Sequence, residues 1–145
     1  MTQAQFKGDV SPLGTWTALA ETAGATLIDV RTQSEWTFVG GPDLTSLNKQ
    51  VHRIEWQKFP GMARNDAFVD EVLAAGIQKD QPLYLLCRSG VRSTAAGKAL
   101  AEHGYTTYNI GGGFEGLLGA DGHRGADGHR GVGGWRAAGL PWQQT

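Results

Sequence analysis

Cys87 is the only cysteine in the chain, and it lies where an apolar run ends and a polar loop begins. The run at 82–86, Pro-Leu-Tyr-Leu-Leu, is typical of a buried strand. The loop at 88–93 is Arg-Ser-Gly-Val-Arg-Ser, and residues 93–103 show the apolar spacing of a helix that ends at Gly104. The cysteine is therefore expected at the junction between a strand and a helix.

A thiolate at this junction would be stabilised. Ligands of parallel sheets bind beyond the carboxyl ends of the strands, and the first N–H groups of a helix favour negative charge. Arg88 and Arg92 flank the thiol in sequence, and cationic neighbours favour the thiolate form. The alternative is a cysteine that only fills core volume. Because a polar loop follows Cys87, we interpret it as a nucleophile that meets an anion.

Alternating helix and strand patterns are expected around this junction. Ser11 is a typical helix cap followed by Pro12, and the helical spacing continues to about Thr22. Asn65 is the expected cap of another helix, which Gly76 ends. Strand patterns occur at 25–30, 51–54, 83–86 and 105–110, with a short first strand around Val10. Strands separated by helices predict an α/β fold, with a mainly parallel sheet and helices on both faces.

The composition favours one compact enzyme domain. The chain has 145 residues and a net charge of -1, so we expect residues 1–145 to form a single domain. No run of Lys and Arg indicates a nucleic-acid partner, and no apolar stretch is long enough to cross a bilayer. A single cysteine cannot form an intramolecular disulfide, and the first residues lack the pattern of a signal peptide. We therefore expect a cytoplasmic protein without a membrane partner.

Several segments carry a resemblance to a known family. The loop Cys87-Arg88-Ser89-Gly90-Val91-Arg92 resembles the active-site loop of the rhodanese (sulfurtransferase) family, which has the form C-R-x-G-x-[RT]. Leu-Ile-Asp-Val-Arg at 27–31, followed by Glu35-Trp36, is similar to the family's strand ending in Asp-Val-Arg and its Glu-aromatic pair. Gly-Gly-Gly-Phe at 111–114 resembles the Gly-Gly-Phe that follows the family's last strand.

The ending of the chain agrees, since Gly134-Trp135 and Gly139-Leu140-Pro141 resemble the family's C-terminal segment. One departure is that the family's Gly-His-Ile-Pro-Gly-Ala segment is absent, and residues 39–57 stand in its place without that motif. The resemblance implies a rhodanese-like fold with a central five-stranded sheet, in a single-domain protein.

The predicted chemistry is a two-step sulfur transfer through Cys87. Its thiolate attacks the outer sulfur of a donor such as thiosulfate, sulfite leaves, and the persulfide passes its sulfur to cyanide or another thiophilic acceptor. The arginines are expected to bind the donor anion, and the loop amides to stabilise the persulfide. The expected substrate-binding residues are Arg88, Ser89, Gly90, Val91, Arg92 and Ser93. No metal or organic cofactor is required, and a protein-borne persulfide could serve as donor or acceptor.

Two other functions remain open. Cysteine-dependent phosphatases and arsenate reductases use the pattern Cys-x5-Arg, whereas here Arg92 comes one residue earlier and position 93 is Ser. The shorter loop makes a smaller cradle, which suits one sulfur atom better than a phosphoryl group. Rhodanese-like domains also occur as binding modules that have lost the nucleophile, but this chain retains its cysteine and both arginines.

We expect mainly structural roles for four further residues. Asp29 and Arg31 end a predicted strand, where the aspartate can accept bonds from nearby backbone N–H groups and an Arg31–Glu35 pair can hold the following turn. Trp36 and Phe38 are expected in the core, with a pocket wall as the alternative.

An exact repeat, Gly-Ala-Asp-Gly-His-Arg, occupies 119–124 and 125–130. We expect a surface loop at 119–131. A metal site is the alternative, since ligand side chains recur there, but glycine-rich sequence offers no rigid support for them. These side chains are Asp121, His123, Asp127 and His129. His52 and His103 are isolated in sequence, so nothing supports a Cys-His protease dyad.

Overall fold

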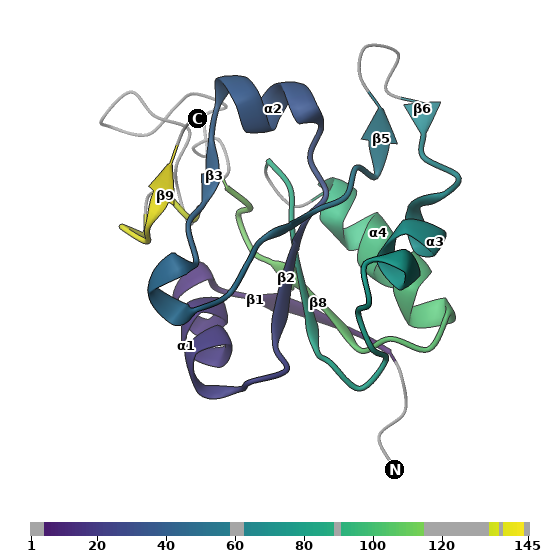
Figure 1. Ribbon diagram of the computed structural model, residues 1–145, viewed down its shortest axis with the longest axis horizontal. Coiled ribbons are helices and arrows are strands. Elements are labelled where there is room, and N and C mark those ends of the chain that lie inside the picture. Colours follow the sequence, from purple (N-terminus) through teal and green to yellow (C-terminus); the bar gives the residue numbers. More distant parts are fainter. Residues whose placement is uncertain (1–4, 59–62, 89–90, 115–133, 137, 144–145) are drawn as a thin grey trace.

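The computed structural model describes residues 5–58, 63–88, 91–114, 134–136 and 138–143. Helices and strands alternate along most of the chain (Figure 1). Their bounds are β1 Phe6–Val10, α1 Pro12–Glu21, β2 Thr26–Asp29, α2 Gln33–Phe38, β3 Gly41–Pro42, the short 3-10 helix η1 Thr45–Leu47, β4 His52–Arg53, β5 Gln57–Lys58, β6 Ala63–Arg64, α3 Phe68–Ala74, β7 Leu83–Leu86, α4 Val91–Glu102, β8 Thr107–Ile110 and β9 Trp142–Gln143.

The central sheet has five strands in the order β1-β8-β7-β2-β4, and every neighbouring pair is parallel. β2 and β7 lie inside this sheet and pair from Thr26↔Leu83 to Asp29↔Leu86. All residues of both strands are buried, which agrees with the apolar Leu-Tyr-Leu-Leu sequence of β7 and with Leu27 and Ile28 at the centre of β2. The predicted α/β fold with a five-stranded parallel sheet is confirmed.

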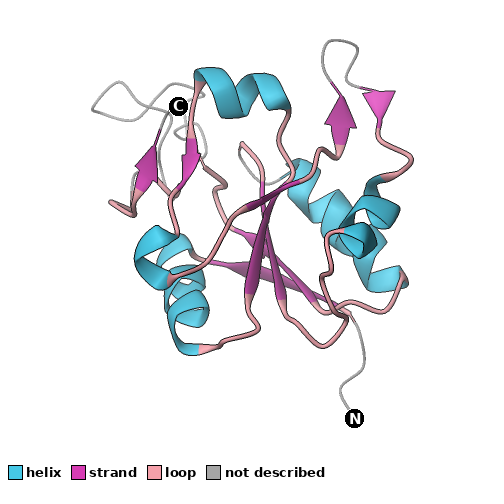
Figure 2. Cartoon of the chain, viewed as in Figure 1, coloured by secondary structure: helices cyan, strands magenta, loops and turns pink. Residues whose placement is uncertain are grey.

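Helices cover both faces of the sheet, as Figure 2 shows. Tyr84 and Leu86 of β7 pack in one core cluster with Leu19 of α1. The second cluster contains Leu83, Leu85 and Cys87, together with residues of α3 and α4. Because side chains alternate between the two faces of a strand, Cys87 continues the row that faces α3 and α4.

Most predicted helix ends are confirmed. The Ser11 hydroxyl accepts the Gly14 N–H at 3.0 Å and caps α1. Gly76 and Gly104 follow α3 and α4 with φ of 82° and 99°, in the left-handed region that glycine enters without strain. None of the helices within the described ranges is long and apolar enough to cross a membrane.

Two predicted helix starts are wrong. α3 begins only at Phe68, and Asn65 instead holds the turn before it, accepting the Ala67 N–H at 3.1 Å. α4 begins at Val91, two residues before Ser93. The apolar spacing begins only inside α4, so the sequence pattern does not show its first turn.

The sequence did not predict α2. This six-residue helix is too short for an apolar period, but Thr32 and Glu35 form a capping box at its start. The Glu35 N–H donates to the Thr32 hydroxyl oxygen, and the Thr32 N–H donates to the Glu35 carboxylate at 3.3 Å. Glu35 is thereby fixed at the amino end of α2.

Candidate active site

Cys87 directly follows β7 and is only 1% exposed. Its carbonyl oxygen accepts the Phe114 N–H at 2.8 Å, and its Sγ lies 3.3 Å from the Ser93 hydroxyl oxygen. Burial alone would suit a core cysteine equally well. The hydroxyl beside Sγ and the start of α4 four residues later give the thiol a polar side, as the predicted strand-to-helix junction requires.

Gly113 packs directly against the backbone of Cys87. A Cβ atom at this position would lie 2.5 Å from the Cys87 carbonyl oxygen and 2.7 Å from the carbonyl carbon and oxygen of Arg88. Gly113 also has a φ of 60°. Only glycine permits this approach, so residues 111–114 form a wall against which the nucleophile is positioned.

Arg92 is joined to Glu35 by a two-pronged salt bridge. Its Nη1 lies 2.5 Å from Oε1 of Glu35, and its Nη2 lies 2.9 Å from Oε2. The side chains are 16% and 19% exposed, respectively. The predicted Arg31–Glu35 pair is therefore wrong, because Glu35 reaches across to α4 instead.

The protonation of both partners reflects this pairing. Burial by itself raises the pKa of Glu35, but hydrogen bonds and charge from Arg92, aided by Thr32 and Arg31, lower it overall. Burial also tends to lower the pKa of Arg92, yet Glu35 and the negative charges of Cys87 and Asp29 raise it overall. The positive charge of Arg92 thus interacts favourably with a thiolate at position 87.

The remaining loop residues are only partly described. Arg88 is exposed, and Val91 and Ser93 belong to the first turn of α4. Ser89 and Gly90 lie outside the described residues, as does the repeat loop at 119–131 with its candidate metal ligands.

Asp29 and Arg31 form a buried ion pair beside this site. Arg31 Nη2 donates to Asp29 Oδ2 at 2.7 Å and to the Gly40 carbonyl at 2.6 Å, and both charged side chains are 0% exposed. The guanidinium also lies over the Phe114 ring, 4.4 Å from its centroid. The pair therefore supports the segment that holds Cys87, in line with its predicted structural role.

The aromatic and histidine predictions have mixed outcomes. Trp36 is half-buried near the Arg53 guanidinium and belongs to neither core cluster, and the side chain of Phe38 is not described. His52 lies on the edge strand β4, and His103 follows the far end of α4. No group of three metal-ligating side chains occurs in the part of the chain that the structure describes.

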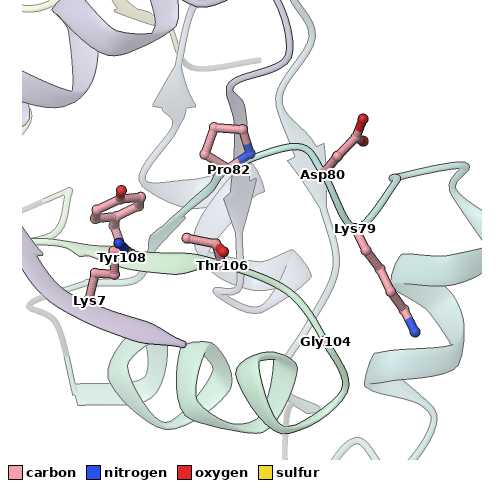
Figure 3. A pocket seen from close by; sticks show the side chains of 7 residues that line it. All are labelled: Lys7, Lys79, Asp80, Pro82, Gly104, Thr106 and Tyr108. Carbon is pink, nitrogen blue, oxygen red and sulfur yellow. The ribbon is translucent and has the colours of Figure 1, made fainter. Parts of the chain in front are cut away.

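A hollow of about 600 Å³ lies at the amino ends of β7 and β8, lined in part by Lys7, Lys79 and Tyr108 (Figure 3). Cys87 follows the opposite, carboxyl end of β7. The hollow is therefore separate from the candidate active site.

Comparison with known proteins identifies the family. The model of the rhodanese-like domain matches residues 15–120. The chain belongs to the rhodanese-like family. Its structure is similar to that of Rv0390 from M. tuberculosis, with a TM-score of 0.83 and 44% identity over 97% of this chain and 100% of that one.

Of two relatives of this rhodanese-like chain, one has a name that states no activity and the other is named for an enzyme activity. The Uncharacterized protein RP600 of Rickettsia prowazekii is 43% identical over 94 residues, which are 63% of this chain and 71% of that protein. Thiosulfate sulfurtransferase GlpE of Actinobacillus pleuropneumoniae is 28% identical over 109 residues, which are 74% of this chain and 83% of that protein.

Three contributors to the site are not predicted by the sequence. They are the pairing of Glu35 with Arg92, the contact of Asn109 with Ser93, and the close approach of Gly113 to Cys87. The Thr-x-x-Glu pattern at 32–35 was a usable signal for the capping box. Nothing local signals the other contacts, since their partners are distant in sequence.

Gly113→Ala should displace the nucleophile. The new methyl group meets backbone atoms that cannot rotate away, and alanine is strained at this φ, so we expect a loss of about 2 to 4 kcal/mol in unfolding free energy. Gly139→Ala is the control, because φ there is 78° and nothing lies within 4 Å of the new Cβ. It should cost only about 1 kcal/mol. Equal losses in urea unfolding would contradict the close packing at Gly113.

Glu35→Gln should reduce stability in a pH-dependent way. Because the pKa of Glu35 is lowered on folding, its ionised form stabilises the fold above its ordinary value of 4.5, and this contribution is lost as pH falls through the lowered value. We expect the variant to be about 1 to 2 kcal/mol less stable at pH 7. The difference from wild type should shrink below pH 4.5.

Urea unfolding at a series of pH values measures this difference. Glu102→Gln is the control, since it removes an exposed carboxylate at the opposite end of α4 and should change stability little. A Glu35→Gln deficit that stays constant down to the lowest pH would show that the ion pair is not its source.

Proposed function

We propose that this protein is a sulfurtransferase that carries a sulfane sulfur as a persulfide on Cys87. The observation that carries the proposal is the position of the one cysteine, at the end of a central parallel strand and before the first turn of a helix, in a rhodanese-like domain. The likeness to a protein named thiosulfate sulfurtransferase adds support.

The first step forms a sulfur–sulfur bond on the enzyme. The Cys87 thiolate attacks the outer sulfur of thiosulfate, the bond between the two donor sulfurs breaks, and sulfite leaves with that electron pair. The negative charge then lies on the outer sulfur of the persulfide. In the second step a thiophilic acceptor such as cyanide attacks this sulfur, thiocyanate leaves, and the thiolate is restored.

The two arginines contribute differently. Arg92 is held by Glu35 and so anchors α4, and its charge also interacts favourably with a thiolate at position 87. Arg88 is exposed and is the residue on which binding of an anionic donor chiefly depends. The persulfide is stabilised in addition by the amide groups of residues 89–93, as a ring of backbone N–H groups stabilises other anions.

A cysteine-dependent phosphatase is the competing enzyme. Its arginine clamps phosphoryl oxygens, whereas here both Nη atoms of Arg92 are bound to the Glu35 carboxylate. This contact favours sulfur transfer over phosphoryl transfer.

Incubation with excess thiosulfate should add the mass of one sulfur atom to the protein, and cyanide should remove it. Cys87→Ser should show neither change, because the chain has no other cysteine. Mass spectrometry measures the adduct, and a parallel assay of aryl phosphate hydrolysis tests the competing enzyme. Phosphatase turnover without cyanide-labile sulfur would overturn the proposal.

Arg88→Ala should lower kcat/KM for thiosulfate by roughly tenfold to a hundredfold, the value of a charge-assisted contact to an anion. Arg92→Ala should have a smaller effect on the KM for thiosulfate and a larger one on stability. Lys7→Ala, which removes an exposed positive charge at the other edge of the sheet, is the control. Unchanged kinetics in Arg88→Ala would favour an uncharged or protein-bound donor.

A further inference from the structure

A row of polar contacts runs from Cys87 to the protein surface. Sγ of Cys87 lies 3.3 Å from the hydroxyl oxygen of Ser93, which is hydrogen-bonded to Oδ1 of Asn109. Asn109 Nδ2 in turn donates to Oδ1 of Asp9 at 2.9 Å. Ser93 and Asn109 are buried, whereas Asp9 is exposed. A buried thiol is thus connected through two buried side chains to a carboxylate in contact with water.

The local structure of β1 aims Asp9 into this row. Asp9 pairs with Asn109 in the sheet, and the register of β1 against β8 shifts between Phe6 and Asp9. Gly8 within this irregular stretch has a φ of 90°. Such irregularities redirect a side chain in an edge strand, and glycine permits the required backbone conformation.

The number of protons along the row limits what Ser93 can do. An ionised carboxylate only accepts hydrogen bonds, so the NH₂ group of Asn109 must face Asp9 and its carbonyl oxygen must face Ser93. The Ser93 hydroxyl has one proton, and both the Asn109 oxygen and the thiolate sulfur are acceptors within its reach. While it donates to Asn109 it cannot donate to Cys87.

We propose that Asp9 is a positioning residue that, through Asn109, directs the Ser93 hydroxyl away from the Cys87 thiolate. This inference rests on the proposed role of Cys87 as the nucleophile. The thiolate that forms lacks this donor and is therefore more reactive toward sulfur. The persulfide does not need a hydrogen bond from Ser93 to Sγ, because its charge lies on the outer sulfur and not on Sγ.

The alternative arrangement requires the loss of the charge on Asp9. If the Asn109 amide turned over, its nitrogen would donate to Ser93 and the Ser93 proton would be released toward Sγ. The Asn109 oxygen would then face the ionised carboxylate of Asp9, and two acceptors would oppose each other. An amide at position 9 removes this conflict, because it can either donate or accept.

Asp9→Asn therefore tests the proposal through alkylation of Cys87 by iodoacetamide, which reports on the only thiol in the chain. The midpoint pH of the alkylation profile should fall by roughly half a unit to one unit, because Ser93 now donates to the thiolate. Above both midpoints the alkylation rate should fall about twofold to threefold, since a stabilised thiolate is a weaker nucleophile.

The same substitution in a Ser93→Ala background separates the hydrogen-bond route from the charge of Asp9 itself. Loss of a nearby negative charge shifts the profile in either background, but the proposed route requires the hydroxyl. The shift should therefore be absent or much smaller without Ser93, and equal shifts in both backgrounds would overturn the proposal. Should Ser93→Ala not fold, Asn109→Val breaks the same route and should also remove the shift.

Apart from Asp9 itself, the charged groups around the thiol are the same in all these variants. They are Arg88, Arg92 with its partner Glu35, and the buried pair Asp29 and Arg31. Alkylation does not depend on sulfur transfer, so the two proposals can fail separately. A protein that shows the Ser93-dependent shift but forms no persulfide would contradict the proposed function and leave the positioning role of Asp9 intact.

Discussion

The backbone of Cys87 is held by the segment that follows β8, and the geometry of the site depends on this contact. The Phe114 N–H donates to the Cys87 carbonyl, and Gly113 approaches so closely that no Cβ fits between them. The segment is itself secured from two directions, since the Trp135 N–H donates to the Gly113 carbonyl at 2.8 Å and Arg31 covers the Phe114 ring. The nucleophile is thus positioned through its backbone rather than through its thiol.

The second constraint is that buried and half-buried arginines at the carboxyl edge of the sheet are paired with carboxylates. Arg31 is paired with Asp29 and Arg92 with Glu35, so buried or half-buried cations are balanced by carboxylates. A buried charge without a partner would be costly, which is why each arginine has a carboxylate within reach. The first turn of α4 also places the positive end of a helix dipole at this edge.

The two constraints meet at Ser93. This residue lies in the first turn of α4, directly after the paired Arg92, and it also contacts both the thiol and Asn109 of β8. Movement of α4 would therefore shift both the charge of Arg92 and the Ser93 hydroxyl relative to Cys87. The Arg92–Glu35 bridge opposes such movement by joining the starts of α2 and α4.

The local features of this protein could be predicted from its sequence. The bounds of β7, the Ser11 cap, the glycines after α3 and α4, and the place of Cys87 between strand and helix all follow from neighbouring residues. The loop motif also predicted the family that the domain match shows. Periodicity, capping and motifs are properties of short segments, so the sequence alone was sufficient for them.

Only the tertiary structure could determine the partners of the site. Glu35 binds Arg92, 57 positions away, although Arg31 is much nearer in sequence. Asp9 reaches Asn109 because the order β1-β8-β7-β2-β4 places β1 beside β8. Local periodicity does not specify which strands lie side by side. The contacts that orient the nucleophile therefore follow from strand order and packing, which arise only when the whole chain folds.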